Sequence, residues 1–203
     1  MKKLVKRVLL CFLLTAVVWC GALLKDRNKL NEALIRLHVV ANSDTPEDQQ
    51  IKLQGRDAIT QSLQRDLNSI GNTEEALSYL NQNLPKLQEI ANSVLRKAGL
   101  EPDAVVTLCR EAFGTRYYDS FALPAGVYNA LRITIGEGQG KNWWCVVYPA
   151  LCGSATTSGF EEAAVEAGLT QPLSGTLAGK EEYKIRFYLL DCLGSLQNKL
   201  FAD

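Results

Sequence analysis

Two kinds of hydrophobic periodicity follow one another along this chain, after an uncharged apolar run near its start. The apolar run, Val8–Leu24, contains no charged residue. From Leu34 to Ala41 apolar and polar positions alternate, which is typical of a half-buried strand. Residues 46–98 then repeat at a spacing of three and four, and after residue 100 the period returns to two. The pattern predicts an apolar N-terminal helix, a strand, two helices and several further strands.

The two predicted helices begin and end at recognisable signals. Thr45 can cap the first helix, Pro46 fits its first position, and the helix should run to about Asn68. Pro85 should kink or split the second helix, because proline removes a backbone donor, and Gly99 should end it. Each helix carries one apolar stripe, so we expect both to lie on a sheet rather than in lipid.

Three later segments alternate and are predicted to be strands: Ala104–Phe113, Gly126–Ile135 and Trp143–Tyr148. The glycine-rich stretch Gly136–Gly140 is predicted to close a hairpin between the last two. It superficially resembles a phosphate cradle, but a true cradle leads into a helix, and here a strand follows. The predicted fold is α+β: an antiparallel or mixed sheet with two amphipathic helices on one face, preceded by an N-terminal signal or anchor helix.

Positive charge surrounds the apolar run. Residues 1–29 carry seven basic side chains against Asp26, a net charge of +6, and because the whole chain is neutral, residues 30–203 carry a net charge of −6. A basic start before an apolar run is typical of export, with the N-terminus inside and the domain outside. We expect residues 1–29 to be a signal peptide or a membrane anchor, and residues 30–203 to be a single extracytoplasmic α+β domain. An acidic domain also argues against nucleic-acid binding.

Four cysteines lie in the predicted exported domain, where disulfides can form and persist. Cys145 and Cys152 bracket a short turn that contains a proline, and this is the pair that we expect to be bridged. Cys109 and Cys192 could form a second bridge, but the sequence alone does not determine their pairing.

The residues assemble into no recognisable active site. His38 is the sole histidine of the chain, so a serine or cysteine nucleophile would have to use it, and no Gly-x-Ser-x-Gly elbow occurs. The chain has neither a Cys-x-x-Cys motif nor a histidine pair to hold a metal. We therefore expect no catalytic residue, no metal, no cofactor and no small-molecule substrate. The alternative is a cell-envelope enzyme that uses His38.

One face of the predicted sheet carries cationic and aromatic side chains. Strand alternation turns Arg36 and His38 away from the apolar side of their strand, and it turns Tyr128 and Arg132 away from theirs. If the helices cover the apolar face, these four residues share the other face as a candidate partner surface, because arginine and tyrosine are favoured interface residues. In the alternative, the four pair with carboxylates inside the domain or lie under its C-terminal segment.

Two ordered blocks of sequence follow one another after residue 34. The first block comprises Ile35–Asp44 (IRLHVVANSD), Asp48-Gln49, Lys52-Leu53 and Arg56-Asp57, and the second comprises Leu123–Ile133 (LPAGxYxALRI), Ile135–Gly140 (IGEGxG) and Asn142–Cys152 (NWWCVVYPxLC). In residues and order, these blocks resemble the stage II sporulation protein R family. The chain departs from the family pattern at Gly55 and Gly114, and the agreement fades after Cys152.

The resemblance implies an exported signalling protein of endospore-forming bacteria that is not itself a protease. It places the protein, secreted or N-terminally anchored, in the space between forespore and mother cell. The implied partner is a membrane-embedded aspartic protease, which activates the mother-cell sigma factor by removing its pro-sequence. A structural envelope protein without a trigger role is a further alternative.

Overall fold

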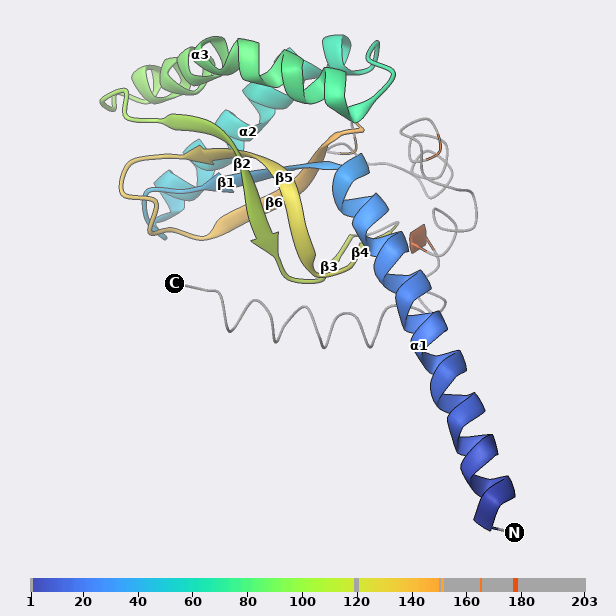
Figure 1. Ribbon diagram of the computed structural model, residues 1–203. Coiled ribbons are helices and arrows are strands. Elements are labelled where there is room, and N and C mark those ends of the chain that lie inside the picture. Colours follow the sequence, from blue (N-terminus) through green and yellow to red (C-terminus); the bar gives the residue numbers. More distant parts are fainter. Residues whose placement is uncertain (1, 119–120, 150, 152–164, 166–176, 179–203) are drawn as a thin grey trace.

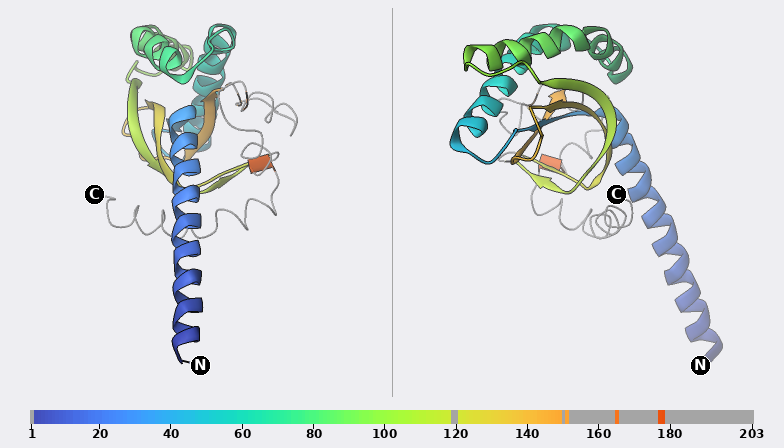
Figure 2. Two further views of the ribbon diagram at one scale, coloured as in Figure 1. Left: turned by 45° about the vertical axis from the view of Figure 1, so that its right-hand side comes forward. Right: turned by 90° about the vertical axis from the view of Figure 1, so that its left-hand side faces the viewer.

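The fold is described by a computed structural model that places residues 2–118, 121–149, 151, 165 and 177–178. Its helices and strands are α1 (Lys2–Ala33), β1 (Ile35–Val40), α2 (Pro46–Leu67), α3 (Thr73–Lys97), β2 (Val105–Phe113), β3 (Arg116–Tyr117), β4 (Ala122–Leu123), β5 (Gly126–Thr134) and β6 (Asn142–Tyr148). Helices α2 and α3 lie together over one side of the sheet, and α1 leaves the domain on the other side (Figures 1 and 2). The α+β class and the predicted strands are confirmed.

Helix α1 is one continuous helix that passes through the predicted boundary between residues 29 and 30. Side chains of its apolar run face solvent, and Phe12 and Val18 are 74% and 73% exposed. Toward its C-terminal end the helix joins the domain, where Leu23 and Leu30 are buried. Among the described residues, α1 is long and apolar enough to cross a membrane. An exposed apolar helix at this position fits a signal or anchor segment.

The main sheet is mixed and has the strand order β2-β5-β1-β6. Strand β1 runs parallel to β5 and antiparallel to β6, and β2 runs antiparallel to β5. The predicted hairpin between β5 and β6 is therefore wrong, because β1 lies between these strands. The glycine-rich loop crosses the end of β1 instead, and Gly140 N–H donates to the Ala41 carbonyl at 2.9 Å. Local turn chemistry alone could not reveal that a distant segment separates the two strands.

Both helices start at capping side chains. Thr45 Oγ1 accepts a hydrogen bond from Asp48 N–H at 3.2 Å, which confirms the predicted start of α2. Asn72 Oδ1 accepts from Glu75 N–H at 2.9 Å and caps α3. Helix α3 runs through Pro85 as a single helix, so the proline does not split it.

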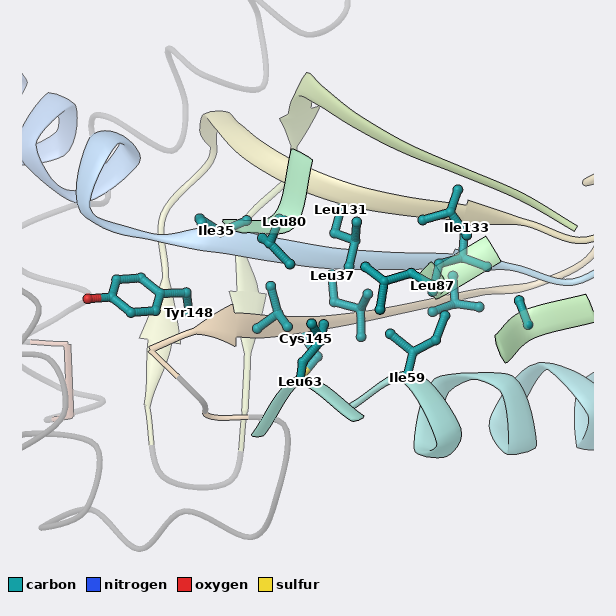
Figure 3. Packing of buried hydrophobic residues seen from close by; sticks show 14 of the residues in the cluster. Ile35, Leu37, Ile59, Leu63, Leu80, Leu87, Leu131, Ile133, Cys145 and Tyr148 are labelled. Carbon is teal, nitrogen blue, oxygen red and sulfur yellow. The ribbon is translucent and has the colours of Figure 1, made fainter. Parts of the chain in front are cut away.

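The main hydrophobic core lies between the sheet and the helices α2 and α3, as Figure 3 shows. Strands β1 and β5 contribute the side chains predicted to face inward, and the two helices contribute the other half of the layer. Its labelled aliphatic members are Ile35, Leu37, Ile59, Leu63, Leu80, Leu87, Leu131 and Ile133. Burying one such side chain stabilises the fold by about 1.5–3 kcal/mol, so this layer is a major source of stability.

The opposite face of the sheet is covered as well, which strand alternation did not predict. A second buried cluster contains Leu30 near the end of α1, Leu34 directly after this helix, Phe121 from the segment between β3 and β4, and the separate residues Leu151 and Leu177. As a result all six residues of β1 are buried. The strand predicted to be half-buried is a central strand between two layers.

Candidate functional site

The structure brings the four residues of the predicted partner surface onto one face of the sheet. In the parallel register of β1 and β5, His38 lies directly beside Arg132. Arg36 and Tyr128 occupy alternate positions of the same two strands, so their side chains point to the same face. This face lies opposite α2 and α3, as predicted.

The face is not the open surface that the alternation predicted. Arg36 and Tyr128 are fully buried, and His38 is 6% exposed. Of the four, only Arg132 reaches solvent, with 40% of its side chain exposed. The physical reason is the second layer formed by the end of α1 and the segment that contains β3 and β4. For His38 and Arg132 the structure favours the alternative reading, since both contact the carboxylate of Glu111.

Arg36 holds its guanidinium among aromatic rings. Its Cζ lies 4.1 Å from the ring centroid of Phe113 and 5.1 Å from that of Tyr128, at distances where cation–π attraction is favourable. Nη2 donates to the Tyr118 hydroxyl at 2.8 Å. Nε and Nη1 are buried and have no hydrogen-bond acceptor among the described residues. Buried donors without acceptors cost free energy, so a hydrogen-bond acceptor placed beside these two nitrogens would stabilise the folded protein.

His38 engages both of its ring nitrogens. Nδ1 lies 2.9 Å from Glu111 Oε1, and Nε2 lies 2.9 Å from Asn142 Oδ1. The ring stacks on Trp144 with a centroid distance of 5.7 Å and meets Phe113 edge-on. Among the described residues neither nitrogen contacts a hydroxyl or thiol, because Glu111 and Asn142 occupy them, so this part of the chain offers His38 no nucleophile to activate. The geometry therefore disfavours the alternative of an envelope enzyme that uses His38.

Glu111 is the carboxylate at the centre of this face. Burial by itself raises the pKa of Glu111, but the hydrogen bond from His38 and the positive charges of His38, Arg132 and Arg36 together hold it below its ordinary value. Arg132 Nη1 lies 3.4 Å from Glu111 Oε1. Glu111 is therefore ionised at neutral pH, and its carboxylate is shared between His38 and Arg132.

The lowered pKa of Glu111 predicts an acid-sensitive contribution to stability. Its pKa is lower in the folded than in the unfolded state, so the ionised carboxylate stabilises the fold above the unfolded value, and this contribution is lost as the pH falls through the folded value. We expect Glu111→Gln to destabilise the domain at about pH 7, with the difference from the parent shrinking toward about pH 3. Urea unfolding of both proteins across this range measures it, and a difference independent of pH would contradict the assignment.

A second polar cluster joins the loop after β1 to the glycine-rich loop before β6. We call residues 41–46 and 136–141 together the loop clasp. Asn42 Oδ1 accepts from Glu137 N–H at 3.0 Å, and Asp44 Oδ1 accepts from Lys141 N–H at 2.6 Å. A Cβ atom at Gly140 would collide with the backbone carbonyl of Ser43. The glycines thus permit a close approach of two loops, and the predicted hairpin turn is corrected to this contact.

Asp48 and Lys52 connect the loop clasp to α2. Asp48 Oδ2 accepts from Ser43 Oγ at 2.5 Å and from Asn42 Nδ2 at 3.0 Å. These hydrogen bonds, that of Ser43 foremost, lower the pKa of Asp48. Lys52 is 4% exposed and donates to the Lys141 carbonyl at 2.9 Å, and burial lowers its pKa. Five residues of the first sequence block, Asn42, Ser43, Asp44, Asp48 and Lys52, therefore take part in this contact.

The bridge between Cys145 and Cys152 stays a prediction, because Cys152 lies outside the described residues, as does Cys192. Cys145 is buried beside Leu37 on the helix side of β6. Leu151 donates its N–H to the Val146 carbonyl at 3.2 Å, so the chain returns to the neighbourhood of Cys145 just before Cys152. We expect peptide mapping of the exported protein without reductant to recover the two cysteines in one linked peptide. Recovery of both as alkylated thiols would contradict this.

Several members of the polar face were not predicted from the sequence. Glu111 and Asn142 reach His38 only because β2 and β6 lie on either side of the β5-β1 pair. Arg116, whose Cζ lies 3.6 Å from the ring centroid of Trp144, belongs to a strand of two residues, which is too short to produce a period. For Glu111 the sequence did offer a signal, since this carboxylate shares a strand face with Cys109 and Phe113. Asn142 and Arg116 gave no such signal.

These observations define an α+β domain that follows an exposed apolar N-terminal helix and carries a polar, cationic layer on one face of its sheet. The stage II sporulation protein R family matches residues 31–158, which is more than half of the chain, and the chain belongs to this family. Stage II sporulation protein R of Bacillus subtilis (strain 168) is 39% identical over 118 residues, which cover 58% of this chain and 53% of that relative. The chain thus spans about half the length of this curated relative. No solved structure matches the chain.

Proposed function

We propose that this chain is an exported sporulation signalling protein that triggers a membrane-embedded aspartic protease, which then processes and activates the mother-cell sigma factor. The observation that carries the proposal is the family membership across residues 31–158. The protein acts from the space between forespore and mother cell. Its partners are the protease and, through the N-terminal segment, the membrane.

The N-terminal helix supports an extracytoplasmic location. Seventeen uncharged residues, Val8–Leu24, follow a basic start, and their apolar side chains are largely exposed rather than packed in a core. In this proposal residues 1–29 are a signal peptide or a membrane anchor, and residues 30–203 form a single domain outside the cytoplasmic membrane.

The chemistry of the described residues supports binding rather than catalysis. His38 has its two ring nitrogens engaged by Glu111 and Asn142. Within the described part of the chain, no group of three or more histidine, cysteine, aspartate or glutamate side chains could hold a metal ion. We therefore propose that the chain is not an enzyme and acts through contact with the protease.

Arg132 is the member of the predicted partner surface that a partner could contact directly. Its guanidinium is partly exposed, and it is anchored by Glu111 and Thr134. Arg132→Ala should weaken signalling, since arginine side chains at interfaces contribute strongly to binding. Arg110→Ala, which removes an exposed arginine from the neighbouring strand β2, is the matched control.

The test is complementation of a sporulating strain that lacks its own stage II sporulation protein R, with a reporter for the mother-cell sigma factor. The parent chain and Arg110→Ala are expected to restore the reporter. Arg132→Ala is expected to restore it poorly at unchanged protein level and with a nearly unchanged melting temperature, because the Arg132–Glu111 pair is partly exposed and contributes little to stability. Co-purification of the chain with the protease separates a trigger from a structural envelope protein. A parent chain that reaches the intermembrane space, leaves the reporter silent and fails to co-purify would overturn the proposal.

A further inference from the structure

Two arginine side chains on the covered face of the sheet carry buried hydrogen-bond donors that have no acceptor among the described residues; Arg36 is fully buried, and Arg116 is partly exposed. In Arg36 these donors are Nε and Nη1, and in Arg116 the donor is Nε. Arg36 belongs to the central strand β1, and Arg116 belongs to β3, which pairs with β4 in a separate two-stranded sheet. Such donors are rare in folded proteins, because each one loses its hydrogen bonds to water on burial.

Aromatic contacts connect the two guanidinium groups into one layer. Arg36 lies over the ring of Phe113, and Phe113 meets the ring of His38 edge-on. His38 stacks on Trp144, and the Cζ of Arg116 lies 3.6 Å from the centroid of the Trp144 ring. Trp144 and Arg116 are partly exposed, so the layer extends from the buried Arg36 to the surface of the domain.

Among the described residues, the carboxylate of this layer is Glu111, and its oxygens already have hydrogen-bond donors. Glu111 accepts hydrogen bonds from His38 and Arg132, and neither Arg36 nor Arg116 hydrogen-bonds to it. The layer therefore has excess positive charge, although residues 30–203 as a whole carry a net charge of −6. A cationic site within an acidic domain selects for an anionic ligand, because such a ligand is repelled elsewhere on the molecule.

We propose that Arg36 and Arg116 form a binding site for a carboxylate on an acidic segment of a partner polypeptide. The planar guanidinium matches a carboxylate in a two-pronged hydrogen bond, which would satisfy the buried donors. The segment enters at the Arg116 and Trp144 end, beside the β3–β4 hairpin that no strand ladder ties to the described main sheet. That the partner is the sporulation protease rests on the proposed function. The binding site itself is inferred from the buried donors and the charge of this layer, independently of that function.

This site predicts opposite effects of one substitution on stability and on binding. Arg36→Met keeps an unbranched apolar side chain and removes a buried charge, two of whose donors lack acceptors among the described residues. It should therefore raise the melting temperature of the isolated protein by about 2–4 °C. The same change should weaken binding of a synthetic hexaglutamate peptide at least tenfold, followed by tryptophan fluorescence through Trp144 and by calorimetry. A hexaglutamine peptide controls for peptide binding without charge.

Arg110→Met is the matched control, since Arg110 is exposed on β2 and should change neither quantity. Arg116→Gln provides a second test of binding that does not alter the central strand. A lower melting temperature in Arg36→Met would mean that the chain itself supplies the missing carboxylate, and it would overturn the proposal. Peptide binding that is absent in the parent, or unchanged in both variants, would also overturn it. A parent that binds the peptide while the sigma-factor reporter stays silent leaves the site standing and refutes the proposed function instead.

Discussion

Replacing Gly140 with alanine is expected to destabilise the domain by about 3 kcal/mol, because the new methyl group meets backbone rather than a movable side chain. The atoms that it would overlap are the carbonyl oxygen and carbon of Ser43, in the loop after β1. Gly140 also donates its N–H to the Ala41 carbonyl, so the two loops cannot separate without losing that hydrogen bond. Urea unfolding of the exported domain measures the loss.

Gly114→Ala is the matched control for this prediction. Gly114 is exposed after β2, no atom lies within 4 Å of the position that its new methyl group would take, and its φ angle is not positive. We expect its stability to stay within about 0.5 kcal/mol of the parent. Equal effects of the two substitutions would show that the loop clasp is not rigid and would contradict the contact described for Gly140.

Removing residues 1–29 is expected to abolish association with membranes and to leave a folded domain that stays in water. The deleted part of α1 carries the exposed apolar side chains, whereas Leu30 and Leu34, which pack in the second core cluster, remain. The deletion also removes the buried Leu23, which should cost about 2 kcal/mol. Co-sedimentation with vesicles of phosphatidylglycerol and phosphatidylethanolamine measures association, and thermal unfolding measures stability.

A chain that begins at residue 23 separates the two effects of this deletion. It lacks most of the apolar run but keeps Leu23, so it should stay in water and be about 2 kcal/mol more stable than the chain that begins at residue 30. The prediction fails if the chain that begins at residue 30 still sediments with vesicles. It also fails if neither of the two shortened chains shows a cooperative unfolding transition.

Periodicity predicted the elements of this fold but not the way in which they are assembled. The alternating segments became β1, β2, β5 and β6 almost residue for residue, because alternation reflects the two faces of one strand. The strand order required knowledge of non-local pairing. A glycine-rich loop such as 136–140 is compatible both with a hairpin and with a connection that crosses a third strand. The structure has the crossing connection, because β1 lies between β5 and β6.

For the candidate site, the sequence predicted which four side chains share a face of the sheet, but neither the other residues of that face nor its burial. Alternation placed Arg36, His38, Tyr128 and Arg132 on one face, which the parallel register of β1 and β5 confirms. It could not show that this face is covered, because the covering elements give weak sequence signals. These elements are the last turns of an otherwise exposed helix and two strands of two residues each.

The central claim is that a domain delivered across a membrane carries the signal. Its most direct test replaces residues 1–22 with an unrelated cleavable signal peptide and produces the chain in the forespore of a strain that lacks its own stage II sporulation protein R. We predict that this exported chain switches on the reporter for the mother-cell sigma factor, and that the same chain without any leader leaves it silent at equal protein level. A silent reporter with the exported chain, or an active one with the chain that has no leader, would contradict the account.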